Sequence, residues 1–145
     1  MGLRLTVPDG WRAYYGIDSD GKITPKKIHV YKGSENVSDV YSKVGITVCV
    51  FPKEEIYLSA KGFYLEVTDI EAVSIGAHLY EGYTCTSCGY PYTMLVSKNE
   101  EYTLQIMVLM KNGKESLSLY DNETLSVISS IEVTYNEWDL DPNYL

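Results

Sequence analysis

The sequence lacks a long apolar stretch. Its most apolar runs are Ile46-Thr-Val-Cys-Val-Phe51 and Ile106-Met-Val-Leu-Met110, whereas a membrane-spanning helix needs about 20 apolar residues. We therefore expect no transmembrane segment. The chain has 145 residues, of which 45% are hydrophobic and 22% charged, and this composition is typical of one globular domain. We place that domain at residues 1–135 and expect the acidic residues 136–145 to form a loose tail.

Basic residues are scarce. The chain has 12 Lys and Arg residues against 20 Asp and Glu residues, which gives a formal net charge of −8. Nucleic-acid binding needs clustered Lys and Arg, but the only adjacent basic pair is Lys26-Lys27. We therefore expect no nucleic acid among the partners.

The spacings that identify common enzymes are also missing. No G-x-S-x-G, G-x-G-x-x-G or Walker motif occurs. The two histidines are His29, expected on a solvated sheet face, and His78, which nothing in the sequence positions beside Cys85. The Asp18-Ser-Asp-Gly21 stretch lacks the closing Glu of a calcium loop and predicts a hairpin turn instead. We therefore expect a protein that is not an enzyme.

Tyrosine, in contrast, is abundant. The chain has 14 Tyr residues against two Trp and two Phe. A Tyr ring suits a half-buried sheet surface, and Tyr is also enriched at binding interfaces. One alternative is plain cross-strand packing. The other is a binding face for a protein or carbohydrate partner, and its candidate residues are Tyr80, Tyr83, Tyr90, Tyr92 and Tyr102.

Cysteine is represented by three residues, two of them in Cys85-Thr-Ser-Cys88-Gly89. This stretch resembles one metal-binding knuckle of a rubredoxin or zinc ribbon, where the Gly permits a left-handed turn. The second knuckle of those proteins is missing. We favour a simple hairpin whose turn uses Thr86, Ser87 and Gly89. A thioredoxin-like redox role needs a helix after the first Cys, whereas both flanks here are predicted strands.

A zinc site remains the alternative for the same stretch, and it can be completed in two ways. In the first, one chain supplies a Cys₃His site with the ligands Cys49, His78, Cys85 and Cys88. In the second, two chains each supply Cys85 and Cys88 to a shared Cys₄ site. The oligomeric state does not follow from the sequence.

The hydrophobic periodicity predicts an α+β fold. Alternating residues predict strands at Leu3–Val7, Trp11–Ile17, Lys26–Lys32, Ile46–Phe51, from Glu66 onward, Ser74–Tyr83, Pro91–Ser97, Tyr102–Met110 and Ile131–Tyr135. Helices are predicted at Ser34–Lys43, from Pro52 to Gly62 (with a strand at Ile56–Ala60 as the rival) and from Asp121 or Asn122. These elements favour an antiparallel sheet of about six strands with two or three helices packed on it.

Four short motifs in this order resemble the PsbP-like fold. They are Val7-Pro-Asp-Gly-Trp11, Ser74-Ile-Gly-Ala77, Tyr102-Thr-Leu104 and Leu125-Ser-Val-Ile-Ser-Ser-Ile131. The resemblance implies a scaffold without a shared active site, found among small bacterial lipoproteins, and hence a binding or accessory role. It also implies an extracellular or cell-surface location. The odd number of cysteines and the lack of a signal-like segment in this chain leave a cytoplasmic location open.

Overall fold

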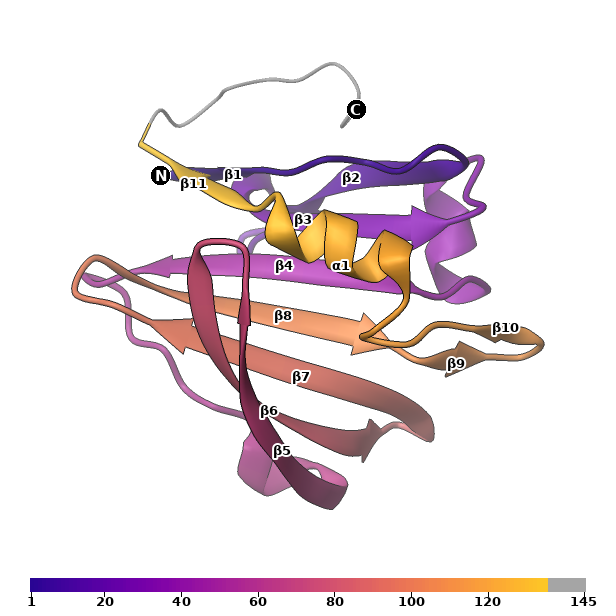
Figure 1. Cartoon of the computed structure of the whole chain (residues 1–145). Helices are drawn as coiled ribbons and strands as arrows, with labels where there is room; N and C mark the ends of the chain where they lie inside the picture. The colour runs from indigo at the N-terminus through magenta and orange to yellow at the C-terminus, as the bar shows by residue number, and fades with distance from the viewer. Residues whose placement is uncertain (136–145) are drawn as a thin grey trace.

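The computed structural model describes residues 1–135, and its centre is one antiparallel sheet of seven strands (Figure 1). Every neighbouring pair in this sheet is antiparallel. From edge to edge, the strands are β2 (Trp11–Ile17), β3 (Ile23–Lys32), β4 (Gly45–Pro52), β8 (Tyr102–Leu109), β7 (Tyr90–Lys98), β6 (His78–Ser87) and β5 (Leu65–Ile75).

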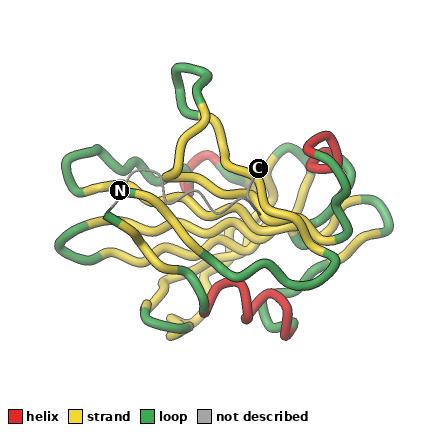
Figure 2. The backbone as a smooth tube through the Cα atoms, turned by 90° about the horizontal axis from the view of Figure 1, so that it is seen from above, coloured by secondary structure: helices red, strands yellow, loops and turns green. Residues whose placement is uncertain are grey.

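The remaining elements are short (Figure 2). One pair of strands joins the two ends of the domain, β1 (Gly2–Arg4) and β11 (Glu132–Thr134), and a second pair forms the hairpin of β9 (Lys111–Asn112) and β10 (Glu115–Ser116). The helical elements are α1 (Asn122–Ser129) and two 3₁₀ turns, η1 (Val37–Tyr41) and η2 (Lys61–Phe63). The protein is therefore mostly β rather than α+β.

Two of the three predicted helices are wrong. The Ser34–Lys43 pattern gives only η1, which is capped by Asn36 and Asp39 and has no buried residue. A short helix without an apolar face to bury gains little from packing, so it does not extend. Between Pro52 and Gly62 the chain runs without regular structure until η2, and Pro52 itself ends β4.

The antiparallel sheet and the closing helix are confirmed. Helix α1 follows Asp121 and buries Val127 and Ile128. The sheet has seven strands, against about six expected. The predicted strand Ser74–Tyr83 is divided by a turn at Gly76, where φ is +61°, so Ser74 and Ile75 belong to β5 and β6 begins at His78. A side chain at Gly76 would start 2.5 Å from the carbonyl oxygen of Ser129, so only glycine lets this turn lie against the end of α1.

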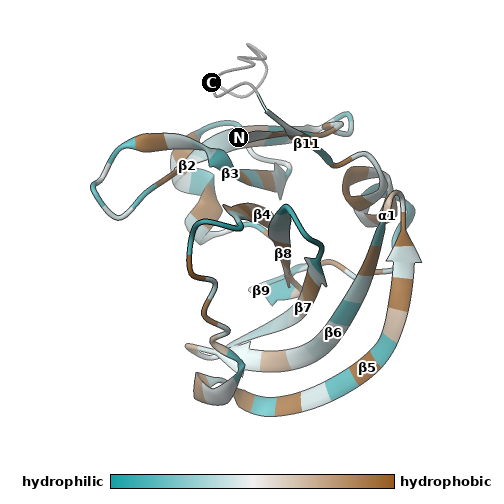
Figure 3. Ribbon diagram, turned by 90° about the vertical axis from the view of Figure 1, so that its left-hand side faces the viewer, coloured by the Kyte–Doolittle hydropathy of each residue, from teal (hydrophilic) through white to brown (hydrophobic). Residues whose placement is uncertain are grey.

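The two faces of the sheet are covered differently. We call the face that packs against α1, β1 and β11 the inner face; it carries the main apolar core, including Val30, Ile46, Leu95 and Ile106. The opposite face, which we call the outer face, is crossed by the connection between β4 and β5. Figures 1 and 3 show α1 on one side of the sheet and this connection on the other. Among the described residues, the only α-helix therefore lies on the inner face.

Candidate functional site

The outer face carries an aromatic and sulfur-containing cluster. Tyr83 lies directly opposite Met94, and Met94 lies opposite Met107 on the next strand. Residues directly opposite one another share a face of the sheet. Tyr83, Cys85 and Met94 are buried there, and Tyr64, Tyr92 and Met107 pack against them. This half of the sheet therefore has an apolar floor of its own, separate from the main core.

The connection between β4 and β5 covers part of that floor. We call residues 53–64 the strap. Tyr57 of the strap donates a hydrogen bond from its hydroxyl to Oε1 of Gln105 at 2.9 Å, and its ring lies 5.1 Å from that of Phe51. At the other end of the strap, the Tyr64 ring lies 6.4 Å from the Tyr83 ring. These contacts hold the strap against the outer face.

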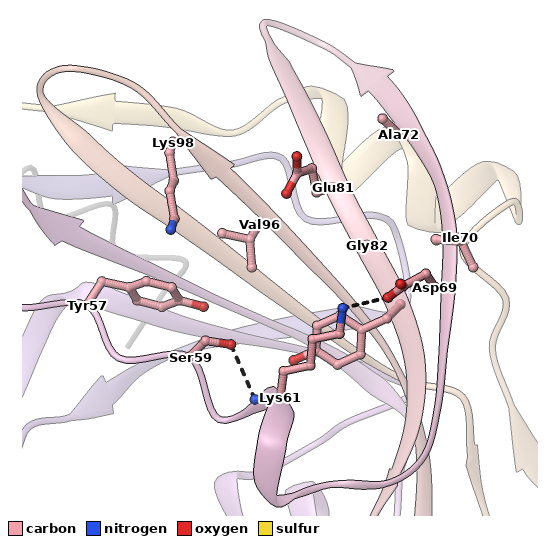
Figure 4. A pocket seen from close by; sticks show the side chains of 11 residues that line it. Tyr57, Ser59, Lys61, Asp69, Ile70, Ala72, Glu81, Gly82, Val96 and Lys98 are labelled. Carbon is pink, nitrogen blue, oxygen red and sulfur yellow. Dashed lines mark hydrogen bonds and ion pairs between the residues drawn. The ribbon is translucent and has the colours of Figure 1, made fainter.

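A cleft of about 400 Å³ opens between the strap and strands β5, β6 and β7 (Figure 4). The volume is within the range of small-molecule sites. Aromatic and apolar side chains share the lining with two lysines and two carboxylates. The lining residues are Tyr57, Ser59, Lys61, Asp69, Ile70, Ala72, Glu81, Gly82, Tyr83, Val96 and Lys98.

Both lysines of the cleft lie over tyrosine rings. The Lys61 ammonium is 5.0 Å from the centre of the Tyr83 ring and forms an ion pair with Asp69 at 2.5 Å. The Lys98 ammonium is 5.4 Å from the centre of the Tyr57 ring. Such cation–π contacts contribute about 0.5 to 1 kcal/mol at exposed positions. They favour positions of the two positive charges over the tyrosine rings.

The tyrosine hydroxyls of the cleft stay protonated. Burial raises the pKa of Tyr83 to about 12, with smaller contributions from Tyr64, Cys85 and Tyr57, while a hydrogen bond with Ser59 acts in the opposite direction. Burial also raises the pKa of Tyr57. At neutral pH both side chains are therefore hydrogen-bonding phenols and not phenolate bases.

The five tyrosines predicted as a binding face do not share one face. Tyr83, Tyr90 and Tyr92 belong to the outer face. Tyr92 lies opposite Cys85 and Tyr90 lies opposite Ser87, and both of these partners are an even number of residues from Tyr83 along β6. Tyr80 is fully buried in the main core. Tyr102 packs against that same core, and its hydroxyl lies 2.8 Å from Nε2 of His78.

Several cleft residues were not among the predicted ones. Tyr57 and Lys61 come from the strap, Asp69 from β5, and Glu81 and Lys98 from β6 and β7. The sequence carried no signal for Tyr57, since its apolar neighbours Ile56 and Leu58 are the residues expected to be buried, whereas both are exposed. The hydrogen bond to Gln105 shows that Tyr57 faces the sheet instead.

The Cys85–Gly89 stretch is a tight β-hairpin. Cys88 and Gly89 have φ angles of +52° and +81° and stand between the paired residues Ser87 and Tyr90. Two consecutive residues with positive φ are the signature of a type I′ turn. The hairpin agrees with the favoured interpretation, but its turn residues are Cys88 and Gly89, and Thr86 and Ser87 belong to the strand.

The four predicted zinc ligands of one chain do not converge. Cys49 lies on β4, three strand spacings from β6, which is about 14 Å. His78 is seven residues from Cys85 along β6, roughly 23 Å in an extended strand. Within residues 1–135, no three His, Cys, Asp or Glu side chains are grouped closely enough to hold a metal ion. The Cys₃His arrangement is therefore not formed.

The shared Cys₄ site between two chains stays a prediction. All three cysteines are free, and Cys88 is exposed while Cys85 is only 4% exposed. Burial raises the pKa of the Cys85 thiol, which disfavours the thiolate that metal binding requires. The expected loose tail at 136–145 lies outside the described residues.

In residues 1–135, no helix is both long and apolar enough to cross a membrane.

Comparisons with protein-family models, with curated proteins and with solved structures found no match to this chain.

Proposed function

We propose that the protein is a non-enzymatic binding domain that holds its ligand in the cleft beneath the strap. The observation that carries the proposal is the lining of that cleft, where two phenols, two ammonium groups and two carboxylates surround about 400 Å³. A concave site with an apolar body and a few charged groups is the usual form of a ligand site. Tyr side chains add large contact area at a low cost in conformational entropy.

The chemistry of the lining favours binding over catalysis. Burial raises the pKa of Tyr57 and of Tyr83. Both phenols therefore stay protonated at neutral pH and are not available as bases. The Lys61 side chain is already engaged in an ion pair with Asp69. These groups can orient a ligand through hydrogen bonds and charge.

The resemblance to the PsbP-like fold supports the same kind of role. That family is a scaffold without a shared active site, and it implies a bacterial protein at the cell surface. The abundance of tyrosine, in turn, suggests a protein or carbohydrate partner. We carry the location and the partner classes as part of the proposal.

A cleft-filling substitution tests the proposal. Val96 is half-buried, lines the cleft and lies opposite Glu81, so Val96→Phe places a ring where the ligand is expected. The matched control is Ile23→Phe, an exposed position at the start of β3, outside the cleft. The chain and both variants are applied to peptide and glycan arrays, and their melting temperatures are recorded.

We expect Val96→Phe to lose the array signals of the parent chain while Ile23→Phe keeps them, with all three proteins folded. An array on which Val96→Phe binds as strongly as the parent chain contradicts the proposal. So does a parent chain that binds nothing on either array.

A further inference from the structure

The cleft holds two lysine–carboxylate pairs, and only one of them forms an ion pair. Lys61 and Asp69 are joined at 2.5 Å. Glu81 and Lys98 are also neighbours, because Glu81 lies opposite Val96 and Lys98 stands two residues further along β7 on the same face. Such diagonal neighbours are about 7 Å apart. Among the residues that the structure describes, however, neither Glu81 nor Lys98 forms an ion pair.

Lys98 is turned away from Glu81. Its ammonium lies over the Tyr57 ring, at 5.4 Å from the ring centre, and Figure 4 shows Glu81 and Lys98 on opposite sides of the Val96 side chain. The cleft therefore offers a carboxylate and an ammonium that are in no ion pair with a described residue, with an apolar side chain between them.

A lysine lies over one face of each tyrosine ring in the cleft, and Tyr83 is only 7% exposed. Lys61 lies over Tyr83 and Lys98 lies over Tyr57, whereas sugar binding by stacking needs an uncovered ring face. Charge is therefore the stronger basis for recognition in this cleft.

Positive and negative side chains are equal in number in the cleft. The protein carries a net charge of −8, but the cleft holds two lysines and two carboxylates. A ligand with a single charge satisfies only Glu81 or only Lys98. A ligand with an amine and a carboxylate satisfies both, since each then makes a charge-assisted hydrogen bond.

We infer that the ligand of the cleft is a zwitterion with a free amine and a free carboxylate, such as an amino acid or a short peptide. This inference rests on the proposed function. The ligand amine donates to the Glu81 carboxylate, the ligand carboxylate accepts from the Lys98 ammonium, and the carbon chain between them lies over Val96. Glu81 and Lys98 are both exposed, so we expect weak binding, with a dissociation constant on the order of 1 mM.

Amide NMR titrations of isotopically labelled protein test this inference. The probes are glycylglycine, its amine-acetylated form, its carboxylate-amidated form and, as a neutral sugar, methyl glucoside. We expect glycylglycine to shift the cleft amides and each blocked form to bind about threefold more weakly or worse. Glu81→Gln should match the loss from blocking the amine, and Lys98→Gln the loss from blocking the carboxylate.

A charge exchange separates direct recognition from a general change of field. Glu81→Lys and Lys98→Glu should each abolish glycylglycine binding, and the double variant should restore it with the ligand reversed. Lys111→Gln, at an exposed lysine of β9 outside the cleft, is the control that leaves binding unchanged.

The outcomes distinguish the two proposals. If methyl glucoside shifts the cleft amides and the charge variants bind it equally, the zwitterion inference is overturned and the binding cleft stands. If glycylglycine binds but the exchanged double variant does not recover, the assignment of Glu81 and Lys98 is wrong. If no probe shifts any cleft amide, both the inference and the proposed site fail.

Discussion

Acidification between pH 6.5 and pH 4.5 should destabilise the protein through His29. This side chain was expected to be solvated, but it is half-buried on the outer face. Its Nδ1 lies 2.9 Å from the Thr47 hydroxyl, and its ring centre lies 6.2 Å from that of Tyr31. Burial, followed by the positive charge of Lys27, lowers the pKa of His29 to about 4. The folded protein therefore resists protonation of His29.

The sign and size of the effect follow from linkage. An unfolded His has a pKa near 6.5, so the unfolded state binds more protons than the folded state between that value and about 4. The stability due to neutral His29 is complete above pH 6.5 and is lost as the pH falls through this window. The window spans about 2.5 pH units, so at about 1.4 kcal/mol per pH unit the upper limit is roughly 3.5 kcal/mol. Because the ring is partly hydrated, we expect about 2 kcal/mol.

Urea unfolding of the parent chain and His29→Gln at several pH values between 7 and 4.5 measures this contribution. The glutamine keeps a polar partner for Thr47 but does not titrate, so its unfolding free energy should fall less steeply with acid. The pH slope of His78→Gln is measured beside that of His29→Gln, because burial also lowers the pKa of His78. Equal pH slopes for the parent chain and His29→Gln would refute the assignment to His29.

Three further predictions concern stability. Cys88 occupies a left-handed position at φ +52°, where Asn is better tolerated, so Cys88→Asn should raise the unfolding free energy by about 0.5 to 1 kcal/mol; a lower midpoint in urea argues against the type I′ turn. The fully buried Tyr80 hydroxyl has no hydrogen-bond partner among the described residues, so Tyr80→Phe should be neutral or stabilising by about 1 kcal/mol; a clear loss in thermal unfolding would reveal a partner for that hydroxyl. Leu58 of the strap is 82% exposed and Ile106 is fully buried, so Leu58→Ala should cost less than about 0.5 kcal/mol and Ile106→Ala about 2 to 5 kcal/mol; comparable losses in calorimetry would mean that the strap residue is packed.

The strands were predictable because their alternation is local. The predicted strand Trp11–Ile17 coincides with β2, and the buried Val127 and Ile128 belong to the predicted closing helix. The helix at Ser34–Lys43 failed for a physical reason. Its apolar residues are divided, since Val37 is exposed in η1 and Val44 is buried at the entrance to β4, and the sequence alone does not show which of them meets the core.

The candidate site was predictable only in part. Alternation along β6 already separates Tyr80 from Tyr83, because residues an odd number apart lie on opposite faces of a strand. Nearness in the chain does not reveal this parity, so tyrosines close in sequence can lie on opposite faces. The path of the strap could not be predicted from the sequence. It brings Tyr57 to Gln105, which lies 48 residues away in the chain. Contacts of this kind depend on the tertiary fold and leave no periodic signal.

Amide NMR spectra of the labelled chain, recorded with a ligand found on the arrays, test the central claim most directly. If the cleft is the binding site, the largest shifts will fall on the strap and on β6 and β7 around Lys61, Tyr83 and Val96, and Val96→Phe will remove them. Shifts confined to the inner face, to the Cys88 turn or to β2 would contradict the account and move the binding site elsewhere on the sheet.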